Sequence, residues 1–184
     1  ILRLAEAQIE LAARYLGGDK DTRDRLERAV DVLEQANRDL AASPDSKDIL
    51  RVAQRDLAVA HLRRGRLRLV EAESLISKNG VTATTLKVAE DALADLQQAL
   101  EGNHLDAQNK EVGQALCLGA LAAAQANQAK TAKDFLTRAH SAGCELVPPY
   151  NRLGLDLLQA FVTYRSTNAP AQRDQMFSVP KVVE

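Results

Sequence analysis

The feature that most constrains the fold is a short pattern of small and large apolar residues that occurs three times. The pattern is Ala-x-x-x-Leu-x-x-Ala, and its copies begin at Ala29, Ala92 and Ala132. Residues three and four apart share one face of a helix, so each copy places a leucine between two alanines on one stripe. Alanine lets two helix backbones approach closely, and the leucine fills the space between them. The pattern therefore predicts helices packed tightly against partner helices.

The composition also favours an all-helical fold. Hydrophobic residues make up 46% of the chain, yet aromatic residues make up only 3%. The apolar residues are mostly Leu, Ala and Val, whereas strands would be expected to use more Ile, Thr, Tyr and Phe in alternation. A chain of 184 residues is long enough for one compact domain or a short array of repeats.

The charge balance and hydropathy exclude two classes of partner. Lys and Arg number 24, Asp and Glu number 25, and the formal net charge is −1, so no overall field attracts nucleic acid. No apolar run reaches the roughly 18 residues that a membrane-spanning helix needs, and no signal peptide begins the chain. We therefore expect neither nucleic-acid binding nor membrane insertion. Because the chain begins at Ile1 and not at Met, we expect the natural start to be missing, with any export signal or anchor it carried.

Helix-breaking residues divide the chain into hairpins. We expect one helical domain over residues 1–166, with hairpins at about 1–42, 47–101 and 106–143 and a last helix at about 149–165. Residues 167–184, which are polar and contain proline, are expected to form an extended tail. Gly65 lies inside the long third helix, where a glycine costs about 1 kcal/mol relative to alanine. It should mark either a break or the close approach of a neighbouring helix.

The three copies resemble the second helices of the tetratricopeptide-repeat family, which carry a small residue, then a bulky one four on, then Ala three further. In the third hairpin, Leu116, Gly119 and Ala120 fall at the bulky and small positions of the family's first helix, and Gly65 takes the first-helix glycine position in the second hairpin. The resemblance implies an all-α, right-handed stack of three antiparallel hairpins with a C-terminal capping helix. Copies start 63 residues apart and then 40 apart (from 29 to 92, then to 132), not the family's repeat of about 34, and its helix-ending proline is absent. The alternative is a closed antiparallel helical bundle.

The resemblance further implies a scaffold that binds a protein or peptide, because the first helices of such hairpins line a concave groove. Mapped onto the second and third hairpins, this groove has an apolar floor and a basic rim, formed by Arg55, Val59, Leu62, Arg66, Leu69, Cys117, Leu121 and Gln125. Such a surface suits an amphipathic helix or an extended peptide. The last helix, Tyr150 to Tyr164, and the tail, Phe177 to Glu184, are alternative occupants of the groove.

Charge patterning suggests what kind of partner would bind. Residues 47–68 contain seven basic side chains against two acidic ones, and arginine recognises carboxylates through paired hydrogen bonds. This predicts an acidic protein or peptide partner, with Arg55 and Arg66 as its electrostatic selectors. The simpler interpretation is an outer face whose arginines pair with the acidic neighbouring helix around Asp91 and Asp95, at little energetic gain.

No motif for catalysis, a cofactor or a metal is present. His61, His104 and His140 lack partners at metal-ligand spacing, and no Gly-x-Ser-x-Gly occurs. Asp91 and Asp95 share a helix face but are expected to be solvated. We therefore predict no enzyme, no cofactor and no metal. A second functional hypothesis is a helical sensor domain that holds a small ligand in an interior cavity.

Two cysteines, Cys117 and Cys144, complete the candidates. If they flank a helical hairpin that turns near Gln128, their heights along the helix axes differ by about 8 Å. Because this offset exceeds the reach of a disulfide, we expect two separate buried thiols. That expectation weakly favours a reducing, cytoplasmic location.

Overall fold

The computed structural model describes residues 2–17, 22–42, 46–106, 110–144, 150 and 155–167. The described chain is all-helical and contains no strand, as the sequence predicts. Its elements are α1 (Leu2–Leu16), α2 (Arg23–Ala41), α3 (Lys47–Asn79), α4 (Ala83–Leu100), the short 3-10 turn η1 (Glu101–Asn103), α5 (Glu111–Gln125), α6 (Ala129–Ala142) and α7 (Leu155–Thr167). The first six residues of the last helix predicted over 149–165 include only one described residue, Tyr150, and the described helix starts at Leu155. The predicted tail lies outside the described residues, except for Thr167, which ends α7.

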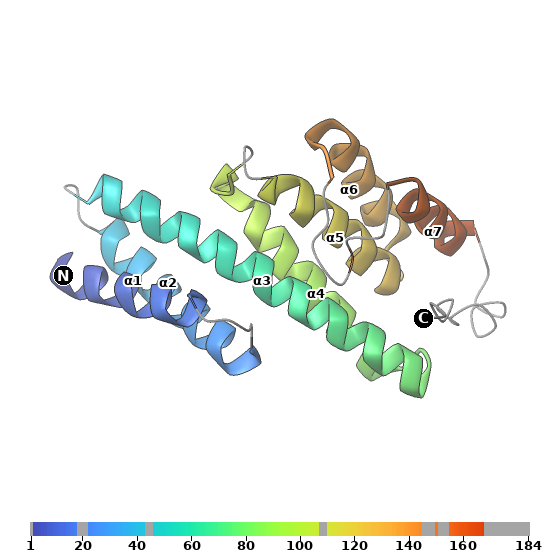
Figure 1. The fold of residues 1–184 in the computed structure, drawn as a ribbon, viewed down its shortest axis with the longest axis horizontal. Coiled ribbons are helices and arrows are strands. Elements are labelled where there is room, and N and C mark those ends of the chain that lie inside the picture. Colours follow the sequence, from blue (N-terminus) through green and yellow to red (C-terminus); the bar gives the residue numbers. More distant parts are fainter. Residues whose placement is uncertain are drawn as a thin grey trace.

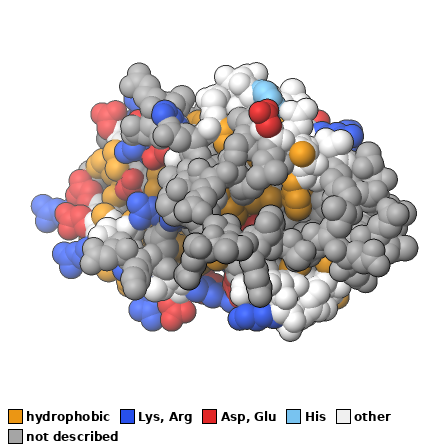
Figure 2. All heavy atoms as spheres, turned by 45° about the vertical axis from the view of Figure 1, so that its right-hand side comes forward, with side chains coloured by type: hydrophobic (Ala, Val, Ile, Leu, Met, Phe, Trp, Pro, Cys, Tyr) orange, Lys and Arg blue, Asp and Glu red, His pale blue; other side chains and the backbone are white. Residues whose placement is uncertain are grey.

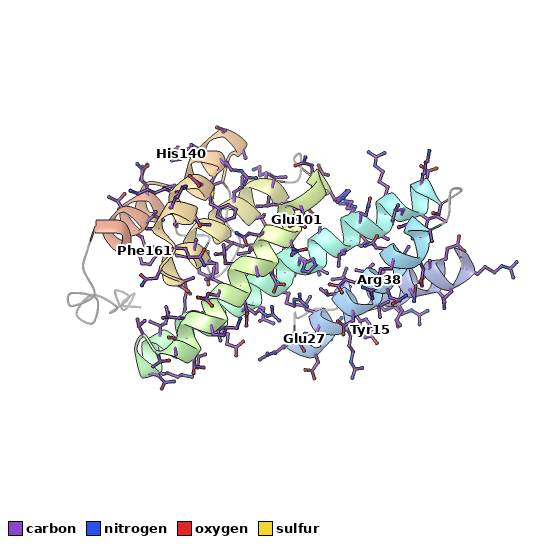
Figure 3. The ribbon with its side chains drawn as sticks, turned by 180° about the vertical axis from the view of Figure 1, so that it is seen from behind. Tyr15, Glu27, Arg38, Glu101, His140 and Phe161 are labelled. Carbon is purple, nitrogen blue, oxygen red and sulfur yellow. A yellow bond between two sulfur atoms is a disulfide. The ribbon has the colours of Figure 1, made fainter. Side chains whose placement is uncertain are left out.

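The helices pack in the order of the chain. α1 pairs with α2, α3 with α4, and α5 with α6, and the hairpins meet through α2–α3, α4–α5 and α6–α7. The first helices of the three hairpins also touch, as α1–α3 and α3–α5, and α7 continues the row by contacting α5. Figure 1 shows the hairpins following one another from left to right, and the view from behind brings α2 and α4 to the front (Figure 3). Among the described residues, α1 makes no extensive contact beyond α2 and α3.

The small residues of the repeated pattern lie where helices meet. All alanines of the three copies are 0% exposed, namely Ala29, Ala36, Ala92, Ala99, Ala132 and Ala139. The leucines between them are at most 7% exposed, namely Leu33, Leu96 and Leu136. The prediction that these alanines face partner helices is therefore confirmed.

Gly65 lies where α3 comes very close to α4. A Cβ atom at this position would be 2.7 Å from Cγ of Leu96 and 3.1 Å from the carbonyl oxygen of Ala92. Both residues belong to the second copy of the repeated pattern. Because α3 continues without interruption from Lys47 to Asn79, the glycine permits a close approach and does not break the helix.

Local signals explain where α3 ends and α4 begins. Gly80 has a φ of +71°, a left-handed conformation that glycine adopts without steric cost, and its N–H donates to the carbonyl of Ile76 at 2.9 Å. Thr82 and Thr85 then form a capping box, in which each side chain bonds the other residue's backbone N–H. These signals place the turn of the central hairpin.

α3 contributes to several parts of the core. Ala53 and Ala60 pack in small clusters with residues of α1 and α2. Ala58, Leu62 and Leu69 belong to the largest cluster, which α4, α5, α6 and α7 also share. This 33-residue helix therefore joins the first hairpin to the rest of the molecule.

Candidate partner-binding surface

One side of α3 carries a row of valines and arginines. They recur every three or four residues, so they share one helix face, and all are exposed or half-buried: Val52, Arg55, Val59, Arg63, Arg66 and Val70. We call this set the α3 stripe. No other helix crosses in front of α3 along its length (Figure 1). A basic, partly apolar band of this kind can hold a segment with apolar and acidic side chains.

The structure distributes the eight predicted groove residues over two environments. Arg55 is exposed, and Val59 and Arg66 are half-buried on the α3 stripe. The other residues of the set are buried: Leu62, Leu69, Cys117, Leu121 and Gln125. Four of these five residues belong to the largest hydrophobic cluster. The apolar residues predicted on α3 and on α5 therefore share one part of the core.

The C-terminal part of the chain packs against the α5 side of the predicted floor. Tyr150, Leu158 and Val162 are at most 4% exposed and belong to the same cluster as the floor leucines. The sequence had named the last helix as an alternative occupant of the groove, and the structure places α7 against α5 and α6. Figure 2 shows hydrophobic side chains gathered near the centre of the face that these C-terminal helices present.

A buried polar group connects α3, α5 and Tyr150. The Tyr150 hydroxyl donates to Oε2 of Glu73 at 2.9 Å, and Nε2 of Gln125 donates to Oε1 of the same carboxylate at 3.1 Å. Gln125 is 3% exposed, and its own Oε1 has no hydrogen-bond partner among the described residues. Sequence reasoning missed Glu73, although it lies seven residues after Arg66 and therefore on nearly the same helix face.

Burial changes the acidity of this group. Desolvation raises the pKa of Glu73, and the hydrogen bonds from Tyr150 and Gln125 only partly oppose it. Burial also raises the pKa of Tyr150, and the neighbouring negative charge of Glu73 raises it further, while Arg66 acts in the opposite direction. The phenol therefore stays protonated and acts as a donor to the carboxylate.

The cysteines form a disulfide, so the prediction of two separate thiols is wrong. The Cys117 and Cys144 sulfurs are 2.06 Å apart, and their Cα atoms are 6.4 Å apart. The argument from helix height assumed that α6 continues to Cys144, but α6 ends at Ala142 and Gly143 turns the chain with a φ of +73°. A Cβ at Gly113 would collide with the Gly143 carbonyl oxygen, so the chain returns directly onto α5. The expectation of a reducing compartment loses its basis.

Asp95 is buried and not solvated, which corrects a second expectation. It is 3% exposed and accepts hydrogen bonds from Arg64 at 2.7 Å and from Arg68 at 2.8 Å. Nδ1 of the buried His61 lies 3.3 Å from the same carboxylate. Desolvation alone would raise the pKa of Asp95, but the hydrogen bonds from His61 and Arg64 and the arginine charges lower it overall. Asp91 instead pairs with Lys87 on the surface.

The arginine-rich segment therefore divides into two groups. Arg64 and Arg68 hold α4 through Asp95, which is the pairing with the acidic neighbour that the sequence offered as the simpler interpretation. Arg55 and Arg66 lie on the α3 stripe, and Arg63 of the same stripe donates to the Leu16 carbonyl oxygen at the end of α1.

A shallow hollow of about 410 Å³ lies between α4 and α6. Arg138 lies over the Phe135 ring at 5.7 Å, and Gln98 donates to Glu101, at the end of α4 (Figure 3). Because these rim groups interact with one another, the hollow lacks a set of groups directed at a common ligand. It differs from the interior cavity that a small-ligand sensor would need.

No cluster of three or more potential metal ligands occurs among the residues that the structure describes. Within the same residues, none of the helices is sufficiently long and apolar to span a bilayer. Comparison with protein-family models, curated proteins and solved structures finds no match to this chain.

Proposed function

We propose that this chain is a tetratricopeptide-like helical repeat module that binds an acidic protein or peptide along the first helices of its hairpins. The observation that carries the proposal is the row of contacts α1–α3, α3–α5 and α5–α7. In such a row the first helices share one face, as they do in open helical arrays. A closed bundle would instead bring helices that are far apart in the chain into contact. The buried alanines of the three motif copies support the same arrangement.

The α3 stripe is the part of this face best suited to a partner. Its valines offer apolar contact, and its arginines offer charge-assisted hydrogen bonds to carboxylates. A segment that presents apolar side chains on one side and Asp or Glu beside them matches this alternation. Binding would gain affinity from apolar burial, and the arginines would set the preference for acidic partners.

Two synthetic amphipathic peptides with the same apolar face test the proposal, one with Glu and one with Lys on the polar face. Fluorescence anisotropy should show tighter binding of the Glu peptide, and its affinity should fall as salt is added. Arg66→Glu should weaken that binding about three- to tenfold, because a charge reversal at a partly exposed site costs about 1 kcal/mol. The variant should also be less sensitive to salt.

Arg28→Glu is the matched control, because Arg28 is exposed on α2, a second helix, and does not belong to the stripe. It makes the same change in net charge and should leave the affinity unchanged. Equal weakening by both variants would show that the effect comes from the net charge and not from the position of Arg66. Equal affinity for the two peptides would remove the charge selectivity, and absence of binding by either peptide would contradict the proposal.

A further inference from the structure

The chain after α6 is fastened back onto α5 and α3. Cys144 is joined to Cys117 of α5, and Gly143 packs directly against Gly113 of the same helix. Tyr150 then reaches Glu73 of α3, which lies 77 residues earlier in the sequence. These contacts position Tyr150 at the junction of two first helices.

The environment of Tyr150 has the parts of a recognition pocket. The side chain is 4% exposed and belongs to the cluster that contains Leu62, Leu69 and Leu121, so the ring has apolar surroundings. Glu73 accepts the phenol hydrogen, and Gln125 holds the other oxygen of that carboxylate. A buried carboxylate without such a donor is costly, so the pocket favours a phenol over a plain benzene ring. Within the described part of the chain, Oε1 of Gln125 has no partner, so it adds hydrogen-bonding capacity that Tyr150 does not use.

The segment that fills this pocket has the character of a bound ligand. α7 buries Leu158 and Val162, four residues apart, and exposes Asp156, Gln159 and Thr163. It is therefore an amphipathic helix laid against α5 and α6, a common mode of peptide binding. α7 packs against α5 and α6, and the disulfide and the Tyr150 contact fasten the chain shortly before it.

We propose that the pocket between α3 and α5 is a binding site for a tyrosine followed by an amphipathic helix, and that Tyr150 and α7 occupy it in cis. The disulfide keeps this internal ligand in place. A dithiol reductant would open it by exchange: the sulfur–sulfur bond breaks, each cysteine gains one electron and one proton, and the reductant becomes a cyclic disulfide. The site lies one helical turn beyond Val70, at the C-terminal end of the α3 stripe, and goes beyond the function proposed above.

The test adds the internal ligand in trans to the full-length chain. The probe is a labelled peptide of residues 144–167 with Cys144→Ser, and the receptor is the chain with Cys144→Ser and Tyr150→Ala, which lacks both fastenings. The peptide should bind this receptor at least tenfold more tightly than it binds the oxidised wild type, where the internal copy competes at high effective concentration. A peptide that also carries Tyr150→Phe should bind about tenfold more weakly, because it leaves the carboxylate without its donor.

Further receptor variants separate the phenol contact from general packing. In the same receptor, Glu73→Gln keeps an acceptor oxygen and should retain binding, whereas Glu73→Ala should lose it. Arg28→Glu should change nothing. Equal binding of the Tyr and Phe peptides, equal binding to the receptor and to the oxidised wild type, or no binding to the folded receptor would each overturn the proposal. These peptides do not test binding at the stripe arginines, so a failure of this proposal can be distinguished from a failure of the proposed function.

Hydrogen exchange on the wild type gives an answer even where the double variant does not fold. Reduction should speed amide exchange in α7 at least tenfold and leave α1 and α2 unchanged, because only the C-terminal segment is released. Unchanged exchange in α7 after complete reduction would contradict the role of the disulfide in holding the internal ligand.

Discussion

Gly65→Ala should destabilise the protein, although the same change in most helices is stabilising. Alanine gains about 1 kcal/mol over glycine from helix propensity. At Gly65, however, the new Cβ would lie 2.7 Å from Leu96 Cγ and 3.1 Å from the Ala92 carbonyl oxygen. One neighbour is a side chain fully enclosed in the core and the other is backbone, so neither can move without separating α3 from α4. Overpacking of this kind costs about 1–3 kcal/mol. Over most of this range, the cost exceeds the gain in helix propensity.

Gly119→Ala is the matched control within the same fold. Gly119 also lies inside a buried helix, but a Cβ there would meet the Phe135 ring at 3.4 Å, which is close to ordinary van der Waals contact. The propensity gain should therefore prevail, and the variant should be as stable as the wild type or up to about 1 kcal/mol more stable.

Urea unfolding followed by far-ultraviolet circular dichroism measures both variants, with the midpoint and slope fitted for each. We expect Gly65→Ala to be less stable than Gly119→Ala by about 2 kcal/mol. Stabilisation of the same size by both substitutions would refute the close approach of α3 and α4 that underlies the packing.

Three further predictions concern the disulfide and the buried acids. Cys144→Ser should be about 3.5 kcal/mol less stable than the oxidised wild type, which is the loop-closure value for a sequence separation of 27; an unchanged urea midpoint would contradict a constraint on the unfolded chain. Because burial raises the pKa of Glu73 above 4.5, its charge costs stability as the pH rises through the folded pKa. Glu73→Gln should therefore be at least as stable as the wild type at pH 7, with the difference closing below pH about 4.5, and a large loss at pH 7 would contradict this. The pKa of Asp95 is lowered, so its stabilisation is present at neutral pH and is lost as the pH falls through the folded pKa. Asp95→Asn should lose about 3 kcal/mol at pH 7 and less in acid, and a pH-independent loss would point to packing alone.

Much of the helical framework could be predicted from the sequence because its cause is local. In the copies that begin at Ala29, Ala92 and Ala132, the small residues lie on one helix face whatever the tertiary structure is. A helix face made of such small side chains is typical of close packing against another helix. The glycine at 65 could be interpreted in the same way, because a glycine inside a helix costs stability unless a close approach of another helix requires it. Helix ends such as Asn79-Gly80 follow from backbone preferences of single residues.

The parts that the sequence did not reveal depend on where the chain travels between helices. The disulfide requires Gly143 to turn Cys144 back onto α5, which no helix arithmetic anticipates. The burial of Asp95 depends on the register between α3 and α4, and its spacing from Asp91 is equally common on solvated faces. The pairing of Glu73 with Tyr150 joins positions 77 residues apart. Periodicity therefore predicts which face a residue occupies, but not which distant residue meets it.

The central claim is that the hairpins follow one another in an open row with the first helices on a common face. Spin labels on introduced cysteines at Glu6 of α1 and Gln159 of α7, both exposed, test it by electron–electron double resonance, since the native cysteines are protected by their disulfide. Three lateral steps of about 8–10 Å between helix axes, combined with an offset of about 30 Å along α3 between Ala53, which packs with Ala5 of α1, and Glu73, which bonds Tyr150, predict a separation of about 40 Å. A main distance near about 10 Å, the spacing of helices in direct contact, would show that the first and last helices meet in a closed bundle and would contradict the account.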